Sequence, residues 1–219
     1  SSDLAEVAVY PFCTISPNTG VVPVPDPRLA RLGELLRPQR LTPTTITFVD
    51  VAGLIAGASK GEGLGNRFLG HIREVDLLVH VVRAFPDTRC PHPLGGLDPV
   101  RDVEVVETEL LLADLEILER HRVKLEKRLK GGDKQAGEAL AVAARLAAAL
   151  NQGRFAKDAG LHPEDLDLLE GVALLTAKPY LFVANTSEEE LKGGRHLAAL
   201  KELAEGRGVP LIPILGDLE

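Results

Sequence analysis

Four short segments along this chain carry the apolar residues typical of β-strands. The segment at 45–50 alternates between polar and apolar side chains and is rich in β-branched residues, which favours a strand. The segments at 77–82 and 179–184 are almost continuously apolar, a pattern typical of parallel strands covered on both faces. A fourth strand is predicted at 209–215, and residues 20–24 form a short extended piece.

Between these strands, apolar residues recur at helical spacing. A long helix is predicted from about Val103, with leucines at heptad spacing that Arg122 interrupts once. A turn at 130–133 and a second helix with an apolar stripe follow, so the two helices form an antiparallel hairpin. A further helix is predicted over 188–205. The heptad leucines are Leu111, Leu115, Leu118, Leu125 and Leu129, and the stripe is Ala139, Val142, Leu146 and Leu150.

The order of the elements predicts the fold class. Strands that alternate with helices indicate an α/β fold with a mainly parallel sheet. The helical hairpin interrupts this alternation, so we interpret it as an insertion. The sequence therefore predicts a sheet-containing domain from residues 1–102 and 171–219, with an inserted helical, coiled-coil-like domain at 103–170.

Composition narrows the class of protein. The chain has 219 residues, 45% of them hydrophobic, which is typical of a globular protein with a real core. The net charge of -7 argues against a protein that covers nucleic acid or anionic membrane with its whole surface. No apolar run approaches the roughly 18 residues that span a bilayer, so we expect no membrane partner. Cys13 and Cys90 are expected to be free thiols in a reducing compartment.

The first candidate for chemistry stands at the end of the strand predicted at 45–50. Residues 50–53 have the DxxG pattern of GTPase-type nucleotide-binding folds. In that role Asp50 holds a water bound to Mg²⁺, and the amide of Gly53 reaches the γ-phosphate of the nucleotide. A strand that ends in a capped turn explains the same letters, so the motif alone leaves both interpretations open.

A second candidate follows the strand predicted at 179–184. Asn185 and Glu188 stand where GTPases carry the N-K-x-D motif that recognises the base. An aspartate there accepts two hydrogen bonds from the guanine edge, whereas the longer Glu188 places its oxygens elsewhere, which weakens the case for guanine. A helix N-cap with acidic residues in the first turn explains the same run equally well.

A third candidate is Thr14, in a segment that precedes the DxxG motif at a distance suited to a switch I loop. Its hydroxyl could join the Mg²⁺ shell once the γ-phosphate is bound, although by itself the segment is a generic loop. A threonine loop, a DxxG strand, a buried strand and an N-xx-acid strand follow one another in the order of a GTPase-type domain. This order makes the three candidates specific.

The residues around these motifs closely resemble the YchF family of Obg-like ATPases. The similar segments are residues 10–15 with 17–22, residues 48–54 with 57–66, residues 80–83 and residues 185–188. The resemblance covers nearly the whole chain, including the hairpin. It implies a Rossmann-like P-loop GTPase-type domain that hydrolyses ATP in preference to GTP with Mg²⁺, associates with ribosomes and works in the cytoplasm.

The chain departs from the family pattern in two ways. It contains no GxxxxGKS/T motif, which supplies the amide cradle and the lysine for the β- and γ-phosphates, and no C-terminal TGS domain. A catalytically inactive fragment that serves as a protein- or RNA-binding scaffold is therefore the alternative to the ATPase. The family also usually has Ser/Cys-Ala where Leu215 and Gly216 stand here, so we expect a different wall on the base side.

Hydrolysis needs a group that orients the attacking water. Most GTPases use a Gln directly after DxxG, but Leu54 stands there and offers no hydrogen bond. The resemblance places a histidine considered for catalysis at His92, whose neutral imidazole could position water. A surface-loop histidine without a catalytic role is the alternative. We expect His80 to be structural and His196 to be solvated.

The hairpin carries basic residues toward its turn, with glutamates between them that could pair with them. Most such runs are solvated faces. Given the family, a ribosomal or RNA partner is the functional alternative. The basic residues are Arg120, Arg122, Lys124, Lys127, Arg128, Lys130 and Lys134.

Overall fold

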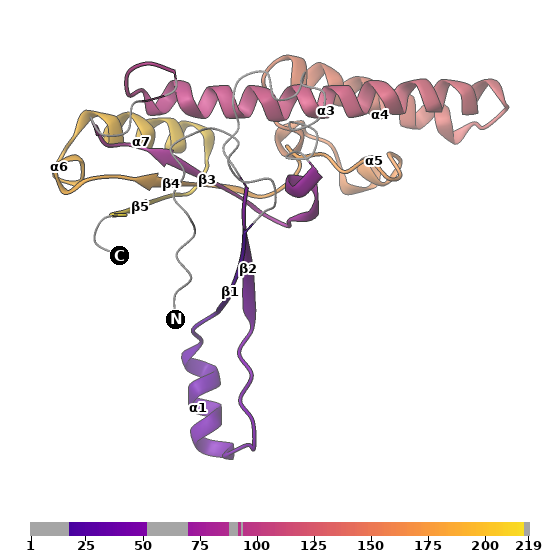
Figure 1. The fold of residues 1–219 in the computed structure, drawn as a ribbon. Helices are drawn as coiled ribbons and strands as arrows, with labels where there is room; N and C mark the ends of the chain where they lie inside the picture. The colour runs from indigo at the N-terminus through magenta and orange to yellow at the C-terminus, as the bar shows by residue number, and fades with distance from the viewer. Residues whose placement is uncertain (1–17, 52–69, 88–91, 93, 217–219) are drawn as a thin grey trace. The chain divides into compact units, whose positions relative to one another are not determined.

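The computed structural model describes residues 18–51, 70–87, 92 and 94–216 (Figure 1). The chain divides into two compact units, residues 1–53 and residues 54–219, which are described in turn. The elements are β1 (Asn18–Pro23), α1 (Pro27–Leu36), β2 (Thr45–Asp50), β3 (Leu78–Arg83), α3 (Pro99–Lys130), α4 (Gln135–Asn151), η2 (Ala156–Asp158), α5 (Pro163–Asp167), β4 (Tyr180–Asn185), α6 (Glu188–Leu191), α7 (Arg195–Arg207) and β5 (Leu211–Ile214).

The described part of the first unit is an antiparallel strand pair with a helix in the connection. β1 pairs with β2 so that Asn18 lies opposite Asp50. The pattern of apolar residues predicts the extended piece at 20–24 and the strand at 45–50, but not the helix α1 between them. Its signal is the Asp26-Pro27 start, because the Asp26 carboxylate accepts the Arg28 N–H at 2.9 Å and proline suits the first helical turn.

The second unit contains a sheet of three parallel strands in the order β3-β4-β5. Each strand lies within two residues of its predicted position. Because the strands are parallel, Arg83, Asn185 and Ile214 end at the same edge of the sheet. The prediction of an α/β fold with a mainly parallel sheet is therefore confirmed.

Helices α3 and α7 pack on one face of this sheet (Figure 1). The side chains of Phe182 and Ala184 on β4 are fully buried there. An ion pair between Glu107 and Arg207 joins the two helices above this core. On β3 and β5, Val81 and Ile212 are 59% and 50% exposed.

His80 on β3 belongs to the sheet interior, as predicted. Its Nδ1 lies 2.9 Å from the hydroxyl of Tyr180 on the neighbouring strand, and its ring packs edge-on against Phe182. Burial lowers the pKa of His80 to about 4, so the imidazole is neutral at pH 7. The residue therefore has a structural role in the sheet.

Helices α3 and α4 form the predicted hairpin and run side by side (Figure 1). Leu118 and Leu125 of α3 are buried together with Val142 and Leu146 of α4. α3 begins at Pro99 rather than near Val103, because the Asp98 carboxylate accepts the Arg101 N–H at 3.1 Å and caps the helix. Among the described residues, no helix is long and apolar enough to cross a membrane.

A buried carboxylate ties the hairpin to the chain that returns to the sheet. Asp114 on α3 accepts hydrogen bonds from the N–H groups of Leu175 and Thr176, each at 2.8 Å, and from the Thr176 hydroxyl at 2.7 Å. Burial raises the pKa of Asp114, and these hydrogen bonds oppose that shift. The base of the hairpin is thus fixed by polar contacts as well as by apolar packing.

The helix predicted over 188–205 is two helices, α6 and α7. Gly193 has a φ of 124°, which breaks the helix between them. The Glu190 carboxylate then accepts the N–H groups of His196 and Leu197, each at 3.1 Å, and caps α7. The same carboxylate lies 2.8 Å from Nδ1 of His196, which is only 14% exposed, so the expectation of a solvated His196 is wrong.

Candidate functional site

Asn185 is the last residue of β4, and the sheet fixes its position. Its carbonyl oxygen accepts the Ala84 N–H at 2.8 Å, and the next N–H, of Thr186, donates to the Ile214 carbonyl at 2.9 Å. The ends of all three parallel strands are therefore linked at this point. Ligands of open parallel sheets bind beyond this edge, as the prediction for Asn185 requires.

Gly216 forms the wall beside Asn185. A Cβ at position 216 would lie 2.9 Å from Oδ1 of Asn185, so a larger residue there would require the Asn185 amide to shift. The backbone at Gly216 therefore lies beside the Asn185 amide. That Leu215 and Gly216 alter the wall on the base side stays a prediction.

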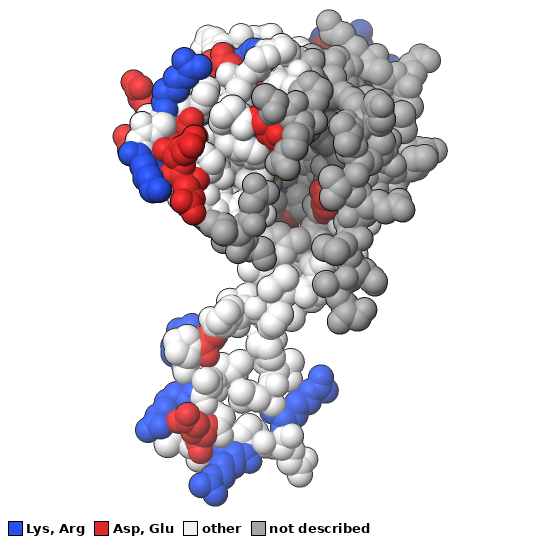
Figure 2. All heavy atoms as spheres, turned by 60° about the vertical axis from the view of Figure 1, so that its left-hand side comes forward, with Lys and Arg blue, Asp and Glu red and all other residues white. Residues whose placement is uncertain are grey.

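Glu188 begins α6 and is exposed. Ser187 caps this helix, because its hydroxyl accepts the Glu190 N–H at 3.3 Å, and Glu188 lies 3.5 Å from the ammonium of Lys192. Figure 2 brings the side that carries α6 forward, and acidic and basic atoms lie next to one another there. The capped helix start is therefore present, and the carboxylate of Glu188 remains at the surface, where a ligand could reach it.

Thr186 is a site residue that the motif comparison missed. It occupies the lysine position of N-K-x-D, and it is only 5% exposed. Within the described residues its hydroxyl oxygen has no hydrogen-bond partner. An unpaired buried hydroxyl costs about 1–3 kcal/mol. Thr186 thus places an unsatisfied polar atom directly after Asn185 at this edge.

His92 lies in the connection between β3 and α3. Its Nε2 is 2.7 Å from Oδ2 of Asp102, and its Nδ1 accepts the Leu94 N–H at 3.2 Å. The side chain is 13% exposed, so His92 is not a freely solvated surface histidine. Its catalytic role stays a prediction.

Arg101 organises the backbone that holds His92. Its guanidinium donates to the carbonyl oxygens of Leu94 at 3.3 Å, Gly95 at 2.9 Å and Gly96 at 2.9 Å. Both glycines have a positive φ, 67° and 65°, which turns their carbonyls toward the guanidinium. The Gly-Gly pair followed by Asp-Pro-x-Arg-Asp is the sequence signal that could have identified Arg101 and Asp102.

The phosphate side of the predicted site is described only in part. Asp50 ends β2 in the first unit and is exposed, and its role as a metal ligand through water stays a prediction. Thr14 and Gly53 lie outside the described residues. Asn185, Glu188 and His92 belong to the second unit. Among the described residues, no cluster of three His, Cys, Asp or Glu side chains could hold a metal ion.

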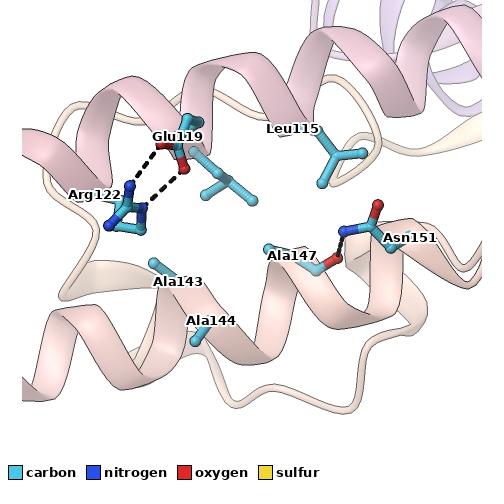
Figure 3. A pocket seen from close by; sticks show the side chains of 8 residues that line it. Leu115, Glu119, Arg122, Ala143, Ala144, Ala147 and Asn151 are labelled. Atoms are coloured by element: carbon cyan, nitrogen blue, oxygen red, sulfur yellow. Dashed lines mark hydrogen bonds and ion pairs between the residues drawn. The ribbon is translucent and has the colours of Figure 1, made fainter.

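A hollow between α3 and α4 is unrelated to these residues (Figure 3). Small alanines on α4 leave the space, and its charged groups already pair, since Arg122 donates to Glu119 at 2.7 and 2.8 Å. The amide nitrogen of Asn151 also pairs, with the Ala147 carbonyl at 2.8 Å, so we interpret the hollow as a packing feature of the hairpin. Its lining is Leu115, Leu118, Glu119, Arg122, Ala143, Ala144, Ala147 and Asn151.

Comparison with known proteins identifies the family. Residues 1–130 match the model of the family described as 50S ribosome-binding GTPase. The ribosome-binding ATPase YchF of Haemophilus influenzae is 46% identical over 214 residues, which are 98% of this chain and 59% of that protein. The Bacillus subtilis protein of the same name is 43% identical over 218 residues, which are 98% and 60% of the two chains. The chain thus spans 59–60% of the length of these relatives.

A solved structure agrees with this assignment. The YchF GTPase of Schizosaccharomyces pombe superposes with a TM-score of 0.75 and 33% identity, covering 97% of this chain and 59% of that chain. At this identity both the fold and the sequence of the relative agree with the present chain. The chain belongs to the YchF family of the 50S ribosome-binding GTPases.

Proposed function

We propose that the whole protein is a YchF-type ATPase, which binds ATP in preference to GTP and acts as a ribosome-associated switch in the cytoplasm. The observation that carries this proposal is the edge of the sheet at Asn185. There the amide of Asn185 beside Gly216, the buried hydroxyl of Thr186 and the exposed carboxylate of Glu188 follow one another. Relatives named ribosome-binding ATPases support both the activity and the partner.

Base selection is assigned to this edge. A guanine-selective site needs an aspartate carboxylate that accepts two hydrogen bonds at once. Glu188 is one methylene longer, and it starts a capped helix that fixes its backbone. The carboxylate therefore lies farther from Asn185 than an aspartate would, which favours adenine over guanine.

Calorimetric titration of the whole protein with ATP and with GTP tests this assignment. We expect ATP to bind at least as tightly as GTP, and Glu188→Asp to shift the ratio toward GTP. Glu189→Asp, one position along the same helix, is the matched control and should leave the ratio unchanged. A tenfold preference of the unmodified protein for GTP, about 1.4 kcal/mol, would contradict the proposal.

Mg²⁺ is assigned to the phosphate side of the site. Asp50 would hold it through a bound water, and the hydroxyl of Thr14 would join its shell. The ion would offset the charge of the phosphates. The amide of Gly53 would contact the γ-phosphate. A complete site also needs the amides and the lysine of a GxxxxGKS/T loop, which these 219 residues do not contain.

Water positioning is assigned to His92. Leu54 offers no hydrogen bond, so another side chain must orient the attacking water. His92 has an imidazole, which can accept a hydrogen bond from water, and its ring is held by three neighbours rather than moving freely in solvent. A catalytically inactive scaffold is the second candidate function, because the phosphate loop motif is missing from the sequence.

The turn of the hairpin is proposed as the ribosomal or RNA contact. Arg122 and Arg128 are engaged with acidic neighbours of the hairpin. Lys124, Lys127 and Lys130 are exposed and form no ion pair within the described residues. Their charges are therefore available for phosphate groups of RNA.

Sedimentation of the protein with ribosomes over a salt series tests the hairpin. Replacing Lys124, Lys127 and Lys130 with alanine should weaken binding and reduce the salt slope by up to about three, because each phosphate contact contributes roughly one unit. The control removes the same charge elsewhere, at Arg40, Lys157 and Lys201. Equal slopes for the two triple variants would remove the hairpin from the interface.

A further inference from the structure

The hydrogen-bond partners of His92 define a single protonation pattern for its ring. A carboxylate only accepts hydrogen bonds, so the 2.7 Å contact with Asp102 requires a proton on Nε2. A backbone N–H only donates, so the 3.2 Å contact with Leu94 requires a lone pair on Nδ1. The two partners therefore agree on the neutral tautomer with its proton on Nε2 and its basic lone pair on Nδ1.

The carboxylate of Asp102 is itself fixed in place. It lies in the first turn of α3, where the helix dipole favours a negative charge. Its Oδ1 accepts from Arg101 at 3.0 and 3.3 Å, which leaves Oδ2 for His92. Side-chain exposure of 16% limits competition from water. Arg101 also holds the backbone of residues 94–96, so one guanidinium orients both partners of the histidine.

We propose that Asp102 is the positioning residue of the ATPase reaction: it fixes the His92 tautomer, so that Nδ1 is the nitrogen that accepts a hydrogen bond from the attacking water. This inference rests on the proposed function of His92. Nδ1 now accepts the Leu94 N–H at 3.2 Å and lies 3.4 Å from the guanidinium of Arg101. Both contacts are long, and the water takes the place of these donors. A carboxylate that orients a histidine base from the other ring nitrogen is a general device of enzyme active sites.

Asp102 differs in this respect from Asp98, the other carboxylate at the start of α3. Asp98 caps the helix through the Arg101 N–H at 3.1 Å and is not a partner of His92. Removing Asp98 tests the loss of a helix cap. Removing Asp102 tests the loss of the histidine partner. Asp98→Ala is therefore the matched control.

The test combines turnover of the whole protein with the ¹⁵N chemical shifts of the His92 ring. In the unmodified protein we expect the shifts of the Nε2–H tautomer. In Asp102→Asn, whose amide can donate to Nε2, we expect mixed or reversed tautomers and a kcat lower by roughly 10- to 100-fold, with KM changed less than twofold. Compared with Asp102→Asn, Asp102→Glu should recover part of the Nε2–H tautomer and part of kcat. Asp98→Ala should leave the tautomer unchanged.

The outcomes separate this inference from the proposed function. A normal kcat in His92→Ala removes the catalytic role of His92, and the inference with it. A large loss in His92→Ala, together with an unchanged tautomer and kcat in Asp102→Asn, removes the inference alone. A raised kcat in Asp102→Asn also overturns it, because Asp102 would then restrain the histidine rather than orient it.

Discussion

The two parts of the candidate site within the second unit are held in different ways. Asn185 is fixed by hydrogen bonds between strands that lie far apart in the sequence, through Ala84 and Ile214. His92 is fixed by residues no more than ten positions away, chiefly Leu94, Arg101 and Asp102. The position of the proposed base-recognition residue thus depends on the sheet as a whole, whereas that of the proposed water-positioning residue depends on one loop and one helix turn.

This difference has consequences for how each part can change. The position of Asn185 cannot shift without breaking the ladder between β4 and its neighbours, so we expect it to be the same with and without ligand. The His92 loop can rearrange by exchanging a few side-chain hydrogen bonds, each with a net value of about 1 kcal/mol. A fixed base site and an adjustable catalytic loop suit a nucleotide switch, in which binding and turnover are controlled separately.

The largest expected effect is on nucleotide binding when the sheet edge at Asn185 acts without a phosphate loop. These 219 residues, purified alone, should bind ATP and GTP more weakly than micromolar, because the phosphates carry most of the negative charge of the nucleotide and the GxxxxGKS/T cradle is missing. Calorimetry measures this directly. A micromolar Kd, about -8.2 kcal/mol, would show that the base edge alone suffices for binding.

The next effect separates the catalytic loop from the base edge. In the whole protein, His92→Ala should lower kcat by roughly 100-fold or more, because it removes the proposed water-positioning group. Nucleotide affinity should change little, since the contact acts mainly in the transition state. Steady-state kinetics and calorimetry on the same sample measure both quantities.

His80→Ala is the matched control for that experiment. It replaces a histidine of the sheet and should reduce stability through a cavity rather than act specifically on turnover. If His92→Ala keeps a near-normal kcat, the water is positioned by the backbone, by a bound cation or by the ribosome. Repeating the assay with ribosomes present then distinguishes the partner from the other two.

The same contrast explains what could be predicted from sequence. Asn185 directly follows an almost continuously apolar segment. That apolar run predicts a buried strand, so the edge of the sheet at Asn185 could be located from the sequence. The hydrogen bonds of His92 do not follow from any pattern of apolar residues. They depend on two glycines with positive φ that turn carbonyls toward Arg101, and on a helix that begins at Pro99, four residues before the predicted start.

The two corrections to the helices have similar local causes. The predicted helix over 188–205 has good helical periodicity, but Gly193 breaks it and the Glu190 carboxylate satisfies the N–H groups at the start of the second helix. Helix α1 was not predicted because the residues around it are rich in proline and glycine. Its Asp26-Pro27 start is nevertheless a recognised beginning of a helix. In each case a capping side chain decided the outcome, and capping depends on geometry that apolar spacing does not reveal.

The smallest expected effect is a pH dependence of folding stability, which tests how rigidly the sheet holds His80. His80 is held neutral between the Tyr180 hydroxyl and the Phe182 ring, and burial lowers its pKa to about 4 from an ordinary value near 6.5. The unfolded chain therefore binds a proton at higher pH than the folded chain. Stability from this group is fully present above about pH 6.5 and is lost as pH falls toward 4. Because the ring keeps some exposure, we expect the loss to be roughly 2 kcal/mol.

Urea unfolding of the 219-residue chain between pH 7 and pH 4.5 measures this loss. His80→Leu removes the titrating group and keeps an apolar side chain in the sheet, so its stability should fall less steeply with pH than that of the unmodified chain. If the His80→Leu curve parallels the unmodified curve, the sheet opens enough to hydrate His80, and the contrast between a rigid sheet edge and an adjustable loop is lost.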